Sequence, residues 1–358
     1  MKINILGGGP AGLYFAILMR LQGHEIHVIE RNPPGNTFGW GVVFSDKTMA
    51  YLRDPDPVTH ERILTHLRTW ENVDIIHRGE LTSVAGNRFS GIARLALLQV
   101  LQERCRELGV NLSYGQEIQD PARYREADLL VGADGVASRV RARYFRPQRS
   151  LGLNRYIWFG TAQPFNGLTL TFRPYGGGMY MAHSYKYSRD LSTFIVEVDQ
   201  PTWQKIRRLP DPREHLQKVF APELQGHPLL SNRSKWIRFV SIKNPRWWVK
   251  NVVLLGDALH TAHFSIGSGT KLAMEDSIAL ARAFQEHPTQ ALPAFEAARR
   301  PAVEKIQAMA EASQRWFEEA RQLMHLEVVP FVYEAMTRSG IDLSKRDPVF
   351  WARYQGGK

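Results

Sequence analysis

The sequence predicts an α/β protein in which a parallel-sheet domain is interrupted by an inserted antiparallel sheet and is followed by C-terminal helices. Three observations predict this class. The chain opens with a strand, a glycine-rich turn, a helix and a second strand. Residues 154–200 carry strand-type patterns without a helical period, and residues 290–327 are rich in Ala, Glu and Arg, as helices are. With 358 residues, 44% of them apolar, the chain can bury a sizeable core, which excludes a disordered protein.

The first thirty residues carry the strongest pattern. A short apolar strand at 3–6 leads into the turn Gly-Gly-Gly-Pro-Ala-Gly at 7–12, which fits G-x-G-x-x-G. A helix follows and ends near Gly23, and a second strand at 26–29 ends at Glu30. This order of strand, turn, helix, strand and terminal acid predicts a Rossmann-like dinucleotide-binding unit.

Three glycines of this turn have predicted tasks. Gly7 permits the tight turn, Gly9 lets a pyrophosphate approach the backbone, and Gly12 lets the helix pack closely on the sheet. The helix N-terminus offers free N–H groups and a positive dipole end to the phosphates. Glu30 follows Gly12 by 18 residues and is placed to accept hydrogen bonds from a ribose.

The middle of the chain is less regular. Residues 35–90 are mixed, with an apolar loop framed by glycines at 39–43. An apolar stripe predicts a helix over about 94–108, and Cys105 on this stripe is interpreted as a core residue, not a nucleophile. Buried strands are predicted at the following places: 129–132, 156–159, 168–172, 179–181, 193–196 and 252–255. The last of these precedes a helix that begins at about Thr270.

Charge and composition exclude several classes. The formal net charge is +11, but the basic residues are spread out and form no recognition-helix pattern, which disfavours nucleic acid as a partner. No apolar run reaches membrane-spanning length, and the chain opens without a signal-peptide layout. A single cysteine excludes intrachain disulfides and a Cys-rich metal site, and no metal is predicted. We therefore expect a cytoplasmic enzyme that does not bind membranes.

Three separated motifs together resemble one enzyme family. The turn at 7–12 is followed by Gly-Ala-Asp-Gly at 132–135 with Ser-Arg at 138–139. Gly-Asp-Ala-Leu-His at 256–260 and Gly-Ser-Gly at 267–269 complete the set. In this order, over roughly residues 1 to 320, the chain resembles the single-component (class A) FAD-dependent aromatic hydroxylases, which include p-hydroxybenzoate hydroxylase.

The resemblance implies bound FAD, with NADH or NADPH as a transient co-substrate, because only one dinucleotide turn is present. The positions that match FAD-contacting positions of the family are Gly7, Gly9, Pro10, Ala11, Gly12, Glu30, Arg31, Gly41, Val42, Arg94, Asp134, Asp257, Gly267, Gly269 and Thr270. Two departures affect the region beside the flavin ring. Residues 261–265 lack the family's prolines, and Lys271 replaces its asparagine.

The resemblance also implies a domain division. We expect a FAD-binding domain from residues 1–150 and 250–290, a β-rich substrate domain at 151–249 and a helical segment at 291–358. Residues 40–90 are expected to face the substrate in part.

The catalytic candidates are His263 and Phe264, ahead of the flavin-contacting turn, and His183 and Tyr185 on the inserted sheet. A histidine satisfied within a half-buried sheet is the simpler interpretation of His183, and sheet packing is the simpler interpretation of Tyr185.

A narrower resemblance concerns the substrate. Residues 38–43, 156–161, 183–188 and 192–197 resemble stretches of salicylyl-CoA 5-hydroxylases and of the monooxygenase half of 2-aminobenzoyl-CoA monooxygenase/reductase. The violacein-pathway tryptophan hydroxylase shares them. The resemblance implies hydroxylation of an electron-rich aromatic ring with NAD(P)H and O2, with an aromatic acyl-CoA thioester as the first expected substrate.

The positive charge favours a phosphate-bearing substrate, and basic groups at 139–143 and 233–238 are candidate partners of CoA phosphates. The alternatives are tryptophan or an intermediate derived from it, a flavin reductase or epoxidase that does not hydroxylate a ring, and a non-catalytic FAD-binding protein. We expect a monomer or a homodimer.

Overall fold

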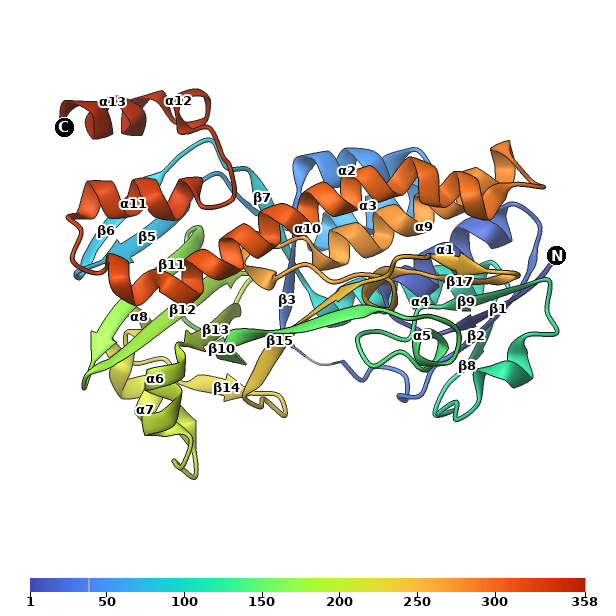
Figure 1. Ribbon diagram of the computed structural model, residues 1–358, viewed down its shortest axis with the longest axis horizontal. Helices are drawn as coiled ribbons and strands as arrows, with labels where there is room; N and C mark the ends of the chain where they lie inside the picture. Colours follow the sequence, from blue (N-terminus) through green and yellow to red (C-terminus); the bar gives the residue numbers. More distant parts are fainter. Residues whose placement is uncertain (38, 358) are drawn as a thin grey trace.

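The computed structural model describes residues 1–37 and 39–357, which form two large sheets joined by one long helix (Figure 1). Phe38, which belongs to the narrower resemblance, lies outside the described residues. The helix α10 (Ala291–Leu323) runs from the end of the molecule that holds the first sheet to the end that holds the second (Figure 1).

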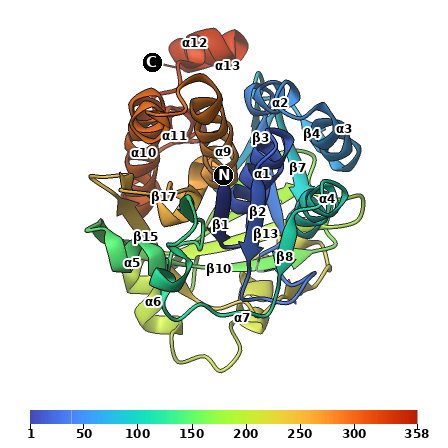
Figure 2. The ribbon, with the colours of Figure 1, turned by 90° about the vertical axis from the view of Figure 1, so that its right-hand side faces the viewer.

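The first sheet has six strands and is parallel except at one edge. Its order is β16 (Trp248–Val249), β17 (Val252–Leu254), β9 (Leu129–Gly132), β1 (Lys2–Leu6), β2 (Glu25–Ile29) and β8 (Asn111–Ser113). Only β16 pairs antiparallel with its neighbour. The helices α1 (Pro10–Leu21), α4 (Arg94–Glu107) and α5 (Arg139–Tyr144) pack on this sheet, and α9 (Gly269–Glu286) packs on α1. Figure 2 looks along the molecule onto α1 and the parallel strands. The prediction of an α/β fold with a Rossmann-like FAD-binding domain is confirmed.

The second sheet follows the order β14 (Leu229–Ser231), β10 (Gln148–Thr161), β13 (Ser192–Val198), β12 (Gly178–Lys186), β11 (Leu168–Tyr175), β5 (Val73–His77) and β6 (Glu80–Val84). A further strand, β15 (Ile237–Lys243), also pairs with β10. The pairs β10–β13, β12–β13 and β11–β12 are antiparallel, as predicted. However, β11 pairs parallel with β5, so the sheet is mixed, and two of its strands come from residues 73–84.

Residues 35–90, which have no clear pattern in the sequence, form regular structure. A small sheet contains β3 (Gly41–Ser45), β7 (Phe89–Ala93) and β4 (Arg68–Trp70). The helices α2 (Asp46–Arg53) and α3 (Pro57–His66) follow β3.

The remaining elements are short helices around the second sheet and at the C-terminus. They are α6 (Gln200–Ile206), α7 (Pro212–Val219), α8 (Ala221–Leu224), α11 (Val328–Thr337), α12 (Leu343–Arg346), α13 (Pro348–Gly356) and the 3₁₀ turns η1 (Pro121–Tyr124), η2 (Gly256–Ala258) and η3 (Phe264–Ile266). None of the helices in residues 1–37 and 39–357 combines the length and the apolar character needed to cross a bilayer.

Cys105 lies in the core, as its place on the stripe of α4 predicts. The side chain is buried, its Sγ is 3.5 Å from the carbonyl oxygen of Leu13, and burial raises its pKa to about 12. The thiol is therefore not a nucleophile at neutral pH.

Candidate active site

The carboxyl ends of three parallel strands meet at one edge of the first sheet. In the register, Leu6 of β1 pairs with Gly132 of β9, which pairs in turn with Leu254 of β17. The strand order reverses direction at β1, and ligands of such sheets bind outside the carboxyl ends at this reversal. The fold therefore brings together the turn after Gly7, the turn at Asp134 and the turn at Asp257.

The glycine turn leaves space for a phosphate. Gly7 has a φ of +114°, and a Cβ at this position would lie 2.2 Å from the carbonyl oxygen of Ala133. A Cβ on Gly12 would lie 2.1 Å from the carbonyl oxygen of Gly7, whereas a Cβ on Gly9 would meet no atom within 4 Å. No side chain of residues 1–37 and 39–357 caps α1, so its first N–H groups can bind an anion.

Pro10 and Ala11 begin the same helix and are buried. Ser277 of α9 donates to the carbonyl oxygen of Ala11 (2.8 Å), and a Cβ on Gly256 would lie 3.0 Å from the Ala11 side chain. The small residue at Ala11 therefore lets α1, α9 and the η2 turn approach one another.

Glu30 is held in a fixed orientation at the end of β2. One carboxylate oxygen accepts from the backbone N–H of Gly8 (2.7 Å), and the other accepts from the backbone N–H and the side-chain amide of Asn32 (2.8 and 2.6 Å). A carboxylate has about four acceptor sites, so Glu30 can still accept from a ribose hydroxyl. Arg31 is exposed beside it.

Asp257 and Arg94 face each other across the site. The Asp257 side chain is exposed, yet desolvation by the surrounding protein raises its pKa, with the charge of Arg94 acting in the opposite direction. Arg94 is partly exposed, and desolvation lowers its pKa while the charge of Asp257 raises it. Because both side chains are accessible to water but enclosed by protein, they border an inward-facing site rather than the outer surface.

Arg94 also holds the loop that precedes β3. Its backbone N–H donates to the carbonyl oxygen of Trp40 (2.8 Å), and its Nε donates to the hydroxyl of Thr37 (3.1 Å). The start of α4 is thereby fixed to the loop that leads to Gly41 and Val42.

Asp134 caps α5. Its Oδ2 accepts from the backbone N–H groups of Arg139 (2.7 Å) and Val140 (3.3 Å), and desolvation raises its pKa. Arg141 is buried and donates to the carbonyl oxygens of Asp257 (3.3 Å) and Ala258 (2.8 Å), which joins this turn to the η2 turn.

The N-terminus of α9 presents a positive end. No side chain caps this helix, and its first turn contains no acidic residue. The turn before it, at Gly267 (φ +63°), lies against β3, because a Cβ on Gly267 would meet Val43 at 3.6 Å. Gly269 and Thr270 therefore begin a helix that can stabilise negative charge beside β3.

These residues fit FAD. The open cradle at Gly9, the fixed carboxylate of Glu30 and the enclosed but accessible Asp257 match a pyrophosphate, a ribose and a ribityl chain in order. No group of three or more His, Cys, Asp or Glu residues suited to a metal ion occurs in the described part of the chain.

An aromatic face of the second sheet adjoins this site. The register places Tyr156, His183 and Tyr185 on one face, and Phe264 of η3 covers it. The Phe264 ring centroid lies 4.5 Å from that of Tyr156 and 5.1 Å from that of His183. Desolvation raises the pKa of Tyr156, and the charge of Asp257 acts in the same direction, so the aromatic face reaches the η2 turn.

His183 is paired within the sheet. Its Nε2 donates to Glu197 (3.1 Å), both side chains are buried, and Asn154 donates to the same carboxylate (2.8 Å). Burial alone would raise the pKa of Glu197, but the hydrogen bond from His183 outweighs it, and the pKa lies below its usual value. The Glu197 carboxylate therefore stays ionised.

His263 is a buried, neutral ring. Ser265 donates its backbone N–H to Nδ1 (3.4 Å), and the Ser265 hydroxyl lies 2.8 Å from the same nitrogen. Burial lowers the pKa of His263 to about 4. Since Nδ1 accepts, the proton of the neutral ring is on Nε2.

Tyr185 ties the second sheet to β3. Its hydroxyl donates to the carbonyl oxygen of Gly41 (2.8 Å), and the backbone N–H of Gly41 donates to Thr193 (3.0 Å). A Cβ on Gly41 would lie 2.6 Å from Tyr187, so the loop passes directly over the sheet. The hydroxyl of Tyr185 already has a structural partner, which favours a positioning role.

Residues 1–310 match the model of the FAD binding domain family. The chain belongs to this family. It is 38% identical to a salicyloyl-CoA 5-hydroxylase from Streptomyces sp over 99% of this chain and 74% of the relative. It is 39% identical to a 3-hydroxy-4-methyl-anthranilyl-(aryl-carrier protein) 5-monooxygenase from Streptosporangium sibiricum, over 88% of this chain and 89% of the relative. It is 33% identical to a protodeoxyviolaceinate monooxygenase from Chromobacterium violaceum, over 93% of both.

Solved structures give the same fold. A tetrameric 2-methyl-3-hydroxypyridine-5-carboxylic acid oxygenase superposes with a TM-score of 0.77 at 20% identity, covering 96% of this chain and 97% of the other. The predictions of an FAD-dependent aromatic monooxygenase, of FAD as cofactor and of NAD(P)H as co-substrate are confirmed at this level.

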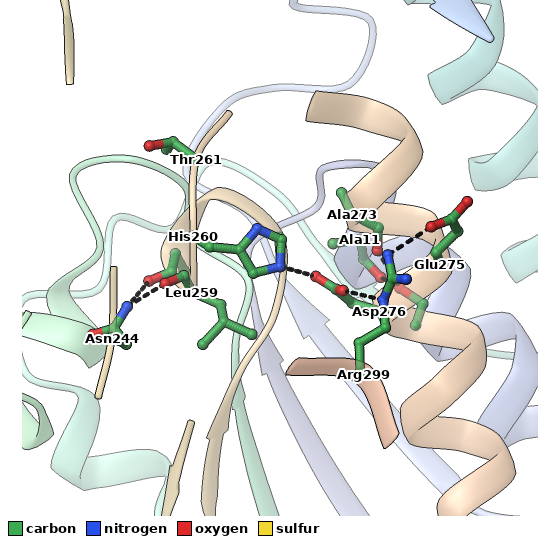
Figure 3. A network of polar contacts seen from close by, with 12 residues as sticks. Ala11, Asn244, Leu259, His260, Thr261, Ala273, Glu275, Asp276 and Arg299 are labelled. Atoms are coloured by element: carbon green, nitrogen blue, oxygen red, sulfur yellow. Dashed lines mark hydrogen bonds and ion pairs between the residues drawn. The ribbon is translucent and has the colours of Figure 1, made fainter. Parts of the chain in front are cut away.

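The sequence motifs of this FAD binding domain protein did not indicate the buried ionic network that Asp276, His260 and Arg299 form next to the η2 turn. Asp276 of α9 is fully buried; its Oδ2 lies 2.7 Å from His260 Nε2 and accepts from the backbone N–H of Gly256 (3.3 Å). Arg299 of α10 donates to Asp276 (2.9 Å) and to Glu275 (2.7 Å). Figure 3 shows His260 and Arg299 directed at Asp276 from opposite sides. Only His260 stands within a motif, and no spacing rule connects Asp276 with Arg299.

Proposed function

We propose that this FAD-dependent monooxygenase hydroxylates the ring of an aromatic acyl thioester, with salicyloyl-CoA and its 5-position as the first candidate. The observation that carries the proposal is the similarity, over 99% of the chain, to a protein named for that reaction. A second relative is named for an anthranilyl group on an aryl-carrier protein. The reaction uses O2 and NAD(P)H, and we place it in the cytoplasm, where this donor is regenerated.

The chain's own residues have distinct roles in this reaction. Bound FAD, once reduced by NAD(P)H, supplies the activated oxygen that reaches the ring. The first turn of α1 and the Gly9 cradle hold the pyrophosphate, Glu30 holds the ribose, and Asp257 holds the ribityl chain. The N-terminus of α9 stabilises the negative charge that reduced flavin carries.

The aromatic face orients the substrate ring. Phe264, Tyr156 and the ring of His183 form a largely apolar wall that excludes water from the reacting atoms. His263 is neutral at pH 7, so it adds no charge beside the ring. An OH or NH2 group ortho to the acyl carbon enriches the ring position para to itself, which is the 5-position.

The predicted partners of CoA phosphates need one correction. Arg141 is buried and bonded to backbone carbonyls, and Arg238 donates to the carbonyl oxygen of Gly152 (2.6 Å). The buried Arg141 is therefore removed from the candidates, whereas Arg238 keeps N–H donors that its bonds to backbone carbonyls do not use. Arg139, Arg143, Arg233 and Lys235 are exposed and, with Arg238, remain candidates.

The violacein relative supports a second candidate, an indole-type substrate derived from tryptophan. The two are separated by assaying NAD(P)H oxidation and hydroxylated product with salicyloyl-CoA, 2-aminobenzoyl-CoA, tryptophan and protodeoxyviolaceinate. We expect product from a CoA thioester and a clear loss of its affinity at high ionic strength, because several phosphate charges are screened. Product from an indole substrate and none from either thioester would refute the proposal. The same preparation, run on a sizing column, tests whether the protein is a monomer or a homodimer.

A further inference from the structure

Arg338 places a guanidinium among neutral acceptors inside the protein. It follows α11, beyond residues 1–310 that match the family model. Its Nε donates to the hydroxyl of Ser313 (3.0 Å), and its two terminal nitrogens donate to the carbonyl oxygens of Ser265 (3.1 Å) and Ala335. An arginine has five N–H donors, so two of them have no bond to the described residues.

Within the described residues, no carboxylate contacts the positive charge of Arg338. No ion pair of Arg338 within 4.0 Å occurs in residues 1–37 and 39–357. The carboxylate whose charge acts on it is Glu197, which already accepts from His183 and Asn154. Burial lowers the pKa of Arg338 to about 10, so the guanidinium stays charged at neutral pH. A charge in this environment is stabilised by an additional acceptor.

The guanidinium adjoins the aromatic face. Its central carbon lies 5.2 Å from the ring centroid of Phe317, and that ring is 4.7 Å from the ring of His183. Ser265, which accepts from Arg338, directly follows Phe264. The side chain is partly exposed although protein surrounds it, so part of it borders an accessible space beside these rings.

We propose that Arg338 recognises a hydroxyl oxygen on the substrate ring and thereby selects hydroxy-substituted over amino-substituted acyl thioesters. This inference rests on the proposed function and narrows its substrate. Arginine only donates hydrogen bonds, and a phenolic oxygen accepts them. A ring amine is a poor acceptor, and its own N–H groups would face those of Arg338. The acyl carbonyl, present in every thioester, cannot give this selectivity.

The test compares three thioesters that differ only at the ortho position: salicyloyl-CoA, 2-aminobenzoyl-CoA and benzoyl-CoA. Dissociation constants are measured by calorimetric titration of the FAD-loaded protein and of its R338Q, R338K and R353Q variants. Arg353 is exposed on α13 and serves as the matched control. We expect R338Q to raise the dissociation constant of salicyloyl-CoA about tenfold or more, which is the scale of a lost charge-assisted hydrogen bond. The dissociation constants of the other two thioesters should change less than about threefold. R338K should recover part of the loss, and R353Q should resemble the wild type.

Two outcomes overturn the inference. Equal weakening of all three thioesters would mean that Arg338 supports the fold or a shared acyl group. Unchanged binding of salicyloyl-CoA would mean that Arg338 does not touch the substrate. If R338Q does not retain FAD, the R338K variant is used in its place. The inference is refuted if R338K prefers salicyloyl-CoA over benzoyl-CoA as strongly as the wild type does. A wild type that binds no thioester refutes the proposed function; salicylate and benzoate then replace the thioesters in the same comparison.

Discussion

At the scale of single residues, Asp257 should separate cofactor binding from folding. Its carboxylate is exposed toward the site. Desolvation raises its pKa, and the positive charge of Arg94 acts in the opposite direction. We expect D257A to weaken FAD binding by about 1–3 kcal/mol, the cost of a lost polar contact, with an unchanged far-UV circular dichroism spectrum. Titration of the apoprotein with FAD, followed by flavin fluorescence, measures the effect. The exposed Asp54 provides the control D54A. Native FAD affinity in D257A would remove Asp257 from the site.

His263 should make stability depend on pH. Burial lowers its folded pKa to about 4, below the value of about 6.5 for an unfolded histidine, so the unfolded chain binds more protons between these values. The stabilisation from the neutral ring is complete above pH 6.5 and is lost as the pH falls toward 4. It is on the order of 3 kcal/mol.

The measurement is urea unfolding of the wild type and of H263Q at pH 4.5, 5.5 and 7. The difference between the two free energies of unfolding should grow with pH. The exposed His66 provides the control H66Q, for which the difference should stay constant. The same pH dependence in both variants would contradict the buried, neutral state of His263.

At the scale of elements, Asp276 fastens α9 to α10 and to the η2 turn. Because it is fully buried and contacts Arg299, His260 and the Gly256 backbone, D276N should leave the Arg299 charge poorly compensated. We expect a loss of about 3–5 kcal/mol in the free energy of unfolding, measured with denaturant. FAD affinity should fall as well, since the turn that carries Asp257 is released.

Changing Asp276 and Arg299 together tests why D276N loses stability. The double variant D276L/R299M removes both charges and should be less destabilised than D276N alone, because the Arg299 charge no longer lies in the core without Asp276. Glu275, which also contacts Arg299, is itself only partly exposed and limits the recovery. Additive losses in the double variant would show that the two side chains do not act as a pair.

At the scale of the whole molecule, the purified protein should be yellow and should hold FAD without a covalent link. We expect the three strand ends, the Gly9 cradle and Glu30 to hold FAD through non-covalent contacts alone. Heat denaturation should release a chromophore that co-elutes with FAD on chromatography. Colour retained in the precipitate, or released FMN, would contradict this prediction.

Local patterns predicted the first sheet better than the second. The turn at Gly7, the helix that follows it and the terminal Glu30 are neighbours in the chain, so their spacing alone indicates their geometry. The strand β5 pairs with β11, and Arg338 reaches Ser265; both contacts join distant segments, which no local pattern indicates. Residues 41–93 form β3 to β7 and two helices because pairing with distant strands, rather than local residue propensity, determines the secondary structure there. The assignment of each candidate residue to FAD or to substrate stays a prediction.

The parallel pairing of β5 with β11 has a consequence for biosynthesis. Ile75 pairs with Leu170, 95 positions later, so the ribosome finishes one strand long before it makes the partner. At about 5–20 residues per second, the β5 edge of the β5–β6 hairpin waits about 5–20 s for its neighbour. During that interval an apolar strand edge is open to any other nascent chain. We therefore expect the β5 edge of the newborn protein to need chaperone protection until residue 170 has been translated.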